Sequence, residues 1–160
     1  MSKNNTLLKI MIGALPIVLT ACGGDGVFQT TQPTAPENVS TLPAQSMEKG
    51  ECITFLWAEQ VNRPLIFTHN IKDDSATILI NQQSVTGTRT SVEGSVIPGF
   101  FTSQSYKAND AVIDIKLKPD AAQNIYEGIK IPSGLITIKS QDGSQNIIPV
   151  SGMLGCNMDS

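Results

Sequence analysis

Apolar and polar residues alternate along much of the chain after residue 50, with the period of two that is typical of β-strands. The clearest case is Ala111–Lys118, whose apolar face carries Ala111, Ile113, Ile115 and Leu117. Pro119 ends this predicted strand, because proline cannot donate a hydrogen bond to a β-ladder. Cys52–Ala58 alternates in the same way. Shorter runs rich in Ile, Val, Thr and Phe predict further strands at 65–69, 76–80, 85–90, 129–131, 135–139 and 147–150.

The segments between these runs contain one candidate helix, 120–127, of about two turns. Asp142-Gly143 indicates a hairpin, with flanking residues that favour a loop longer than two. We interpret 92–106 as an irregular strand whose Phe100 and Phe101 enter the core; the alternative is a hairpin tip that exposes them to a partner. The sequence therefore predicts an all-β fold, either a small antiparallel β-barrel or a β-sandwich, behind a disordered tether.

The first 21 residues have the features of a secretory signal peptide. Lys3 and Lys9 make the start positive, and the apolar run at 10–19 is about half the length that a membrane-spanning helix needs. The segment ends in Leu19-Thr20-Ala21-Cys22, which resembles the lipobox of bacterial lipoproteins, L-[ASTVI]-[GAS]-C. The alternative is an ordinary cleaved signal that is followed by a cysteine by chance.

The lipobox resemblance implies that Cys22 becomes the mature N-terminus and carries a diacylglycerol on its thiol. Two or three acyl chains anchor a protein stably, whereas one alone binds a membrane only marginally. Loss of 1–21 removes two lysines and leaves 9 basic against 14 acidic residues, a net charge of −5, so lipid rather than a basic patch would hold the protein. Inner-membrane lipoproteins typically carry Asp after the cysteine, where this chain has Gly23. The resemblance thus implies the cell outer membrane, facing the periplasm or the surface.

We predict that residues 22–47 consist of the lipidated cysteine and a flexible tether, and that residues 48–160 form the folded domain. Positions 23–47 contain three prolines and no Lys or Arg, and their apolar residues show neither strand nor helix periodicity. Such a segment behaves as a coil that separates the domain from the membrane.

Cys52 and Cys156 bracket the predicted strands, and the compartment beyond the inner membrane is oxidising. We therefore predict a disulfide between them, which would make the first and last strands neighbours. The alternative is a metal site with two thiolate ligands. Such a site needs further ligands, and the chain has only one histidine, His69.

Residues suited to catalysis are sparse. His69 lies where a predicted strand gives way to a polar turn, which favours an exposed histidine over a catalytic one. Asp73-Asp74 is interpreted as a solvated turn in preference to a calcium site. None of the familiar hydrolase, zinc-protease or nucleotide-binding motifs occurs. The net charge of −3 over 160 residues argues against nucleic acid as a partner. We therefore predict a protein that is not an enzyme and has no metal or cofactor.

Two short segments resemble the membrane-bound inhibitors of c-type lysozyme, which are small β-barrel lipoproteins. Residues 84–90, S-V-T-G-T-R-T, are similar to the S-A-S-G-A-R-Y stretch of that family, and 107–111, K-A-N-D-A, are similar to its K-G-D-E-A segment. In the family a short loop and a later Lys enter the lysozyme cleft and meet its catalytic carboxylates. The resemblance implies that Thr86, Gly87 and Lys107 would take these roles.

The sequence thus favours an outer-membrane lipoprotein whose β domain is a non-catalytic binding or structural module of the cell envelope. An inhibitor of c-type lysozyme is its most concrete form, and a component of an envelope secretion or assembly machine is a further alternative. The expected partners are the membrane, through the lipid on Cys22, and an envelope protein.

Overall fold

The computed structural model describes residues 41–120, 124–125 and 128–158, so the predicted signal peptide and Cys22 lie outside the described residues. In the described part no helix is long and apolar enough to cross a membrane. The strands there are β1 (Cys52–Ala58), β2 (Leu65–Asn70), β3 (Ser75–Ile80), β4 (Gln83–Ile97), β5 (Phe100–Ala108), β6 (Ala111–Lys118), β7 (Asn124–Ile125), β8 (Gly128–Lys139) and β9 (Gln145–Cys156).

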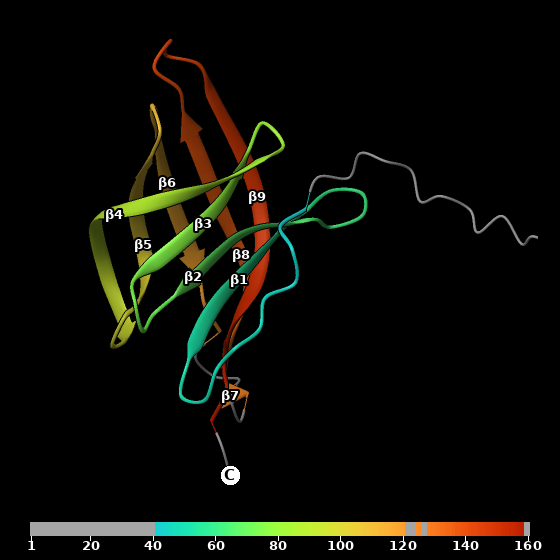
Figure 1. Ribbon diagram of the computed structural model, residues 1–160, viewed down its shortest axis with the longest axis vertical. Helices are drawn as coiled ribbons and strands as arrows, with labels where there is room; N and C mark the ends of the chain where they lie inside the picture. Colours follow the sequence, from blue (N-terminus) through green and yellow to red (C-terminus); the bar gives the residue numbers. More distant parts are fainter. Residues whose placement is uncertain (1–40, 121–123, 126–127, 159–160) are drawn as a thin grey trace, which may run out of the picture. The chain divides into compact units, whose positions relative to one another are not determined.

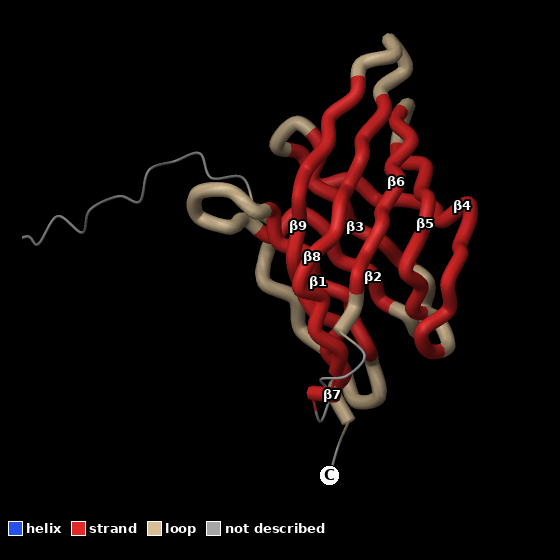
Figure 2. The backbone as a smooth tube through the Cα atoms, turned by 180° about the vertical axis from the view of Figure 1, so that it is seen from behind, coloured by secondary structure: helices blue, strands red, loops and turns tan. Residues whose placement is uncertain are grey.

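Eight of these strands form a closed antiparallel barrel, seen from two sides in Figures 1 and 2. From β1 to β6 each strand pairs with the next along the chain, then β6 pairs with β8, β8 with β9, and β9 with β1. β7 pairs only with Gly128 and Ile129 at the start of β8. Closure gives each of the eight strands a paired neighbour on both sides over at least part of its length. The all-β prediction is confirmed, and of its two forms the barrel is the one observed.

The interior is filled by alternate residues of the strands, as the sequence pattern predicts. In β6 the inward side chains are buried and Val112, Lys116 and Lys118 between them are exposed. Phe100 is fully buried, which confirms that this aromatic enters the core. Phe101 is half-buried, and the guanidinium carbon of Arg89 lies 5.2 Å from the centre of its ring. The largest fully buried side chains are Tyr106, Phe67, Phe100, Leu56, Ile78 and Ile113.

A β-bulge changes which residues of β2 face inwards. The β1–β2 register shifts so that Leu56 pairs with Phe67 but Trp57 pairs with Leu65. Ile66 therefore joins Phe67 in the interior cluster, while Leu65 stays outside it. The carbonyl of Leu65 accepts a 2.8 Å hydrogen bond from the amide of Leu42, whose side chain is only 3% exposed. The packed domain thus begins before residue 48, because Leu42, assigned to the tether from the sequence, is buried against the barrel.

Cys52 and Cys156 form a disulfide across the seam where the barrel closes. They are directly opposed in the β1–β9 register, with Cα atoms 4.0 Å apart. Backbone hydrogen bonds continue past them, because the amide of Asn157 donates to the carbonyl of Glu51 at 2.8 Å. The predictions of a disulfide and of neighbouring first and last strands are confirmed.

Loops 59–64, 81–82, 109–110 and 140–144 lie at one end of the antiparallel ring, which we call the mouth. In Figure 1 the last three are in the upper part of the picture, and the β1–β2 loop protrudes to the right. The loop around Asp142-Gly143 is longer than two residues, as predicted, since β8 ends at Lys139 and β9 begins at Gln145. The prediction of a helix at 120–127 is wrong for the residues of this range that the structure describes. Asn124 and Ile125 form β7 there, because their backbone groups pair with β8.

The structure also corrects the expectation that His69 is an exposed turn residue. It lies in β2, faces inwards with Phe67 and is 0% exposed. Asp74 in the following turn reaches back, so that its Oδ1 is 2.9 Å from His69 Nε2 and 2.6 Å from Arg89 Nη2. Burial lowers the pKa of His69 because the charged ring would lose its hydration, although the hydrogen bond to Asp74 opposes this shift. The ring is therefore neutral at pH 7.

Candidate functional site

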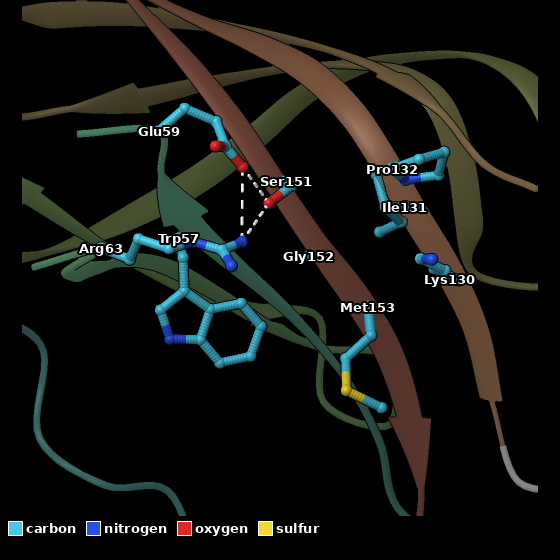
Figure 3. A pocket seen from close by; sticks show the side chains of 9 residues that line it. All are labelled: Trp57, Glu59, Arg63, Lys130, Ile131, Pro132, Ser151, Gly152 and Met153. Atoms are coloured by element: carbon cyan, nitrogen blue, oxygen red, sulfur yellow. Dashed lines mark hydrogen bonds and ion pairs between the residues drawn. The ribbon is translucent and has the colours of Figure 1, made fainter. Parts of the chain in front are cut away.

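A groove of about 650 Å³ lies on the outer wall of the barrel over β1, β8 and β9 (Figure 3). We call it the outer groove. It is lined by aromatic, aliphatic, thioether and charged side chains together: Trp57, Glu59, Arg63, Lys130, Ile131, Pro132, Ser151, Gly152 and Met153.

The hollow arises from an irregularity in the β8–β9 ladder. Ile131 pairs with Gly152, but the next pair is Gly134 with Val150, so Pro132 and Ser133 together oppose the single residue Ser151. Proline has no amide hydrogen and cannot continue a ladder, which explains why the strand bulges at this point. A bulge bends the strand away from its partner and leaves space between them.

The apolar part of the outer groove comes from outward-facing residues of β1 and β9. Trp57, the only tryptophan of the chain, is half-buried, and its ring is stacked on Phe55 with centroids 6.0 Å apart and planes at 25°. Both rings point outwards because Leu56 between them fills the barrel. Met153 lies across from Trp57 in Figure 3, next to the Gly152 backbone. Together these side chains form an accessible apolar surface.

Three polar side chains close the other end of the groove. Arg63 Nη2 donates to Ser151 Oγ at 2.6 Å and lies 3.3 Å from Glu59 Oε1, while the Ser151 hydroxyl donates to Glu59 (Figure 3). Asn62 and Arg63 have left-handed backbone angles, φ of 71° and 40°, which turn loop 59–64 back towards β9. The ion pair is largely exposed, so its main effect is to position the groups rather than to stabilise the fold.

The side chains of the outer groove offer apolar contact, hydrogen bonds and charge. The groove contains no histidine. In the described ranges no group of three or more His, Cys, Asp or Glu side chains is placed to hold a metal ion. Arg63 and Lys130 supply two positive charges against one from Glu59. An apolar platform with hydrogen-bonding groups at its end, and a small positive excess, describes a binding surface.

Residues expected from the lysozyme-inhibitor resemblance lie on the opposite side of the ring, in β4 and β5. Lys107 pairs with Thr88, and Thr86 is the next residue on the same exposed face of β4. Gly87 points inwards, where an added Cβ would be 2.9 Å from Ile78 Cδ1. The structure thus brings Thr86 and Lys107 together on the outer wall, within strands rather than in a loop, and places Gly87 on the inner face.

Sequence reasoning missed the outer groove. The pattern places Trp57 in a strand but in no site, and Ser151 is too far from Glu59 and Arg63 in sequence to suggest a cluster. One signal was present, since Pro132 interrupts an otherwise regular β pattern between Ile131 and Leu135. Such an interruption indicates a bulge, and bulges often re-aim side chains next to functional sites.

No protein-family model, no curated protein and no solved structure matches this chain.

Proposed function

We propose that this protein is an outer-membrane lipoprotein, anchored through Cys22, whose barrel is a non-catalytic binding module for a protein of the cell envelope. The observation that carries the proposal is the outer groove, where the half-buried Trp57 and Met153 lie beside the Glu59–Arg63–Ser151 cluster. The lipid anchor is supported by the lipobox-like segment that ends at Cys22.

The composition of the outer groove favours a protein partner. Trp, Met and Arg are enriched at the centres of protein interfaces, where a few such residues supply most of the binding energy. The disulfide-closed barrel presents Trp57 and Met153 from strands, so little ordering of these two residues is needed on binding. The positive excess favours a partner segment in which an apolar side chain is adjacent to a carboxylate.

Site-specific photocrosslinking in cells tests this proposal with the full chain. A photoreactive residue at Met153 should give a discrete adduct with an envelope protein. The same residue at Val112, an exposed apolar position of β6, should not. Arg63→Glu should abolish the Met153 adduct while leaving the amount of folded protein unchanged, because Arg63 is exposed. Equal adducts from both positions, or none from Met153, would contradict the proposal.

A second candidate, inhibition of c-type lysozyme, is supported by the exposed face that β4 and β5 share, where Lys107 is opposite Thr88 and Thr86 is the next residue of β4 on that face. A hydroxyl and an ammonium are able to hydrogen-bond two catalytic carboxylates. In a lysozyme assay, Lys107→Ala should abolish inhibition and Lys116→Ala, an exposed lysine of β6, should not. Absence of inhibition by the unchanged protein eliminates this candidate and leaves the outer groove unaffected.

A further inference from the structure

A second hollow, independent of the outer groove and of its proposed partner, opens at the mouth of the barrel. Its volume is about 660 Å³, within the range of small-molecule sites in proteins. Residues from loops 59–64, 81–82 and 140–144 surround it together with the adjoining ends of β2, β3, β8 and β9. These loops include the protruding β1–β2 loop and the turns at the top of Figure 1.

The hollow exists because the β2–β3 ladder is short. Its register covers four residue pairs, from Asn70↔Ser75 to Phe67↔Ile78, all on the side away from the mouth. The β3–β4 ladder, in contrast, continues to Ile80. Beyond Phe67 and Ile78 the neighbouring strands β2 and β3 are no longer paired, and Ile66, Leu79 and Ile80 line the space between them.

The floor of this cavity is aliphatic. Ile66, Leu79 and Ile80 line it from β2 and β3, and Ile138 and Ile148 line it from β8 and β9. All five are buried or half-buried members or neighbours of the hydrophobic core. No aromatic ring lines the cavity, so it lacks the stacking platform that would favour a sugar ring or a nucleobase. An aliphatic chain fits such a floor through apolar burial.

The rim is uncharged and mostly polar, with Val61 as its exposed apolar member. Six carboxamides and two hydroxyls line it, whereas 16% of the whole chain is charged. Across the described residues, none of the six carboxamides makes a side-chain hydrogen bond, so their donors and acceptors face solvent. They belong to Gln60, Asn62, Asn81, Gln82, Gln145 and Asn146. A charged ligand would find no counter-charge here, whereas hydroxyl and amide groups would find matching partners.

The backbone of the β3–β4 turn is consistent with a binding role for its side chains. Asn81 and Gln82 both have positive φ, 49° and 66°. A two-residue turn with both angles positive is adopted most easily by Asn followed by Gly. Gln82 therefore holds a long carboxamide at a position where glycine would be less strained, and that carboxamide lies on the rim.

We infer that the barrel mouth binds a neutral amphiphile, with its aliphatic chain against the isoleucine floor and its hydroxyl or amide head group at the carboxamide rim. The ligand class follows from the two halves of the cavity, which are aliphatic below and uncharged but hydrogen-bonding above. A chain with a carboxylate head would bind more weakly, since it must lose hydration without gaining an ion pair.

The test uses three probes with the full chain carrying Cys22→Ala, so that no attached lipid competes. Octyl glucoside below its micelle concentration combines chain and neutral head, octanoate replaces the head by a charge, and glucose lacks the chain. Octyl glucoside should bind saturably and at least about tenfold more tightly than either other probe. Amide chemical-shift changes should be confined to 60–66, 79–82 and 138–148. Equal binding of octanoate, or shifts centred on Trp57, would overturn the inference.

Two variants separate the rim from the floor. Asn146→Asp changes an exposed carboxamide to a carboxylate of the same shape and should weaken octyl glucoside binding about tenfold. The matched control is Gln45→Glu, an exposed carboxamide that does not line the cavity and should change nothing. Leu79→Trp should fill the half-buried floor and abolish binding. If it unfolds, Asn146→Asp still decides, because unchanged affinity in that variant contradicts a site at the mouth.

Discussion

The buried His69 ring links the stability of the barrel to pH. It is the only histidine of the chain, and burial lowers its pKa below the ordinary value of 6.5. In the unfolded chain the ring takes up a proton near pH 6.5, while in the barrel it stays neutral to a lower pH. The unfolded state thus binds more protons between these two values, so the free energy of unfolding falls as pH falls through this window.

We predict that the free energy of unfolding decreases between pH 7.5 and pH 5 and that His69→Gln removes this slope. Glutamine keeps a hydrogen-bond donor for Asp74 but does not titrate. Urea unfolding followed by Trp57 fluorescence at several pH values measures both proteins. A slope that persists in the variant would show that another group is responsible.

Carboxylates affect the free energy of unfolding in a separate and more acidic pH range. Hydrogen bonds from Lys139 and Ser105 lower the pKa of Asp114 below 3.8, so its contribution is present at higher pH and is lost only as pH falls through the folded value. Lys139→Met should therefore reduce stability at neutral pH but leave the slope between pH 7.5 and pH 5 unchanged. This variant serves as the control for His69→Gln.

At the scale of elements, the β1–β9 seam depends on the absence of a side chain at Gly152. A Cβ at this position would lie 1.9 Å from the Phe55 carbonyl oxygen and 2.9 Å from Leu56 Cδ2. The first of these atoms is backbone and cannot move without shifting β1. The pairing that closes the barrel therefore requires glycine here.

We predict that Gly152→Ala destabilises the protein by about 3 kcal/mol, the upper part of the range for overpacking. Gly155→Ala in the same strand is the matched control, since its Cβ would meet only side-chain atoms at 3.7 Å or more. Its stability should stay within about 0.5 kcal/mol of the unchanged protein. Chemical denaturation measures both, and equal losses would contradict the role given to the seam.

For the molecule as a whole, the Cys52–Cys156 bridge links the first and last strands of the barrel across 104 residues of sequence. In the chain-entropy description, a loop of this length restricts the unfolded state by about 4–5 kcal/mol. Total stabilities of domains are about 5–15 kcal/mol, so loss of the bridge should be a large part of the whole.

We predict that Cys52→Ser, Cys156→Ser and reduction of the unchanged protein each lower the free energy of unfolding by several kcal/mol. The double variant should be no less stable than either single variant, because each single variant already removes the whole disulfide. Guanidinium unfolding with and without reductant measures this. Free thiols at both positions in protein freshly isolated from the envelope would contradict it.

A second prediction at this scale concerns the anchor. We expect Cys22 to be the mature N-terminus and to carry lipid, because it follows the lipobox-like Leu19-Thr20-Ala21. Mass spectrometry should show acyl chains on Cys22, and Cys22→Ala should leave the membrane fraction. An unmodified Cys22, or a Cys22→Ala protein that still sediments with membranes, would refute the anchor.

Local sequence determined the most regular strands and their inner faces. The alternation in Ala111–Lys118 and Cys52–Ala58 gives strands with the same bounds in the structure, because the side chains of a strand alternate between two faces whatever its neighbours are. The pairing of Cys52 with Cys156 was also predictable, since only two cysteines remain in the domain after Cys22. These features depend on residue type and order alone.

Tertiary structure decided where strands meet and where they part. His69 faces inwards with Phe67, and its partner there is Asp74 of the next turn, which in turn pairs with Arg89 of β4. No local pattern encodes this chain of contacts. The outer groove depends on which residue of β9 opposes the bulge at Pro132, and the mouth on where the β2–β3 ladder stops at Phe67. Register between strands is set by the packing of the closed ring as a whole, so the sites that it creates appear only in three dimensions.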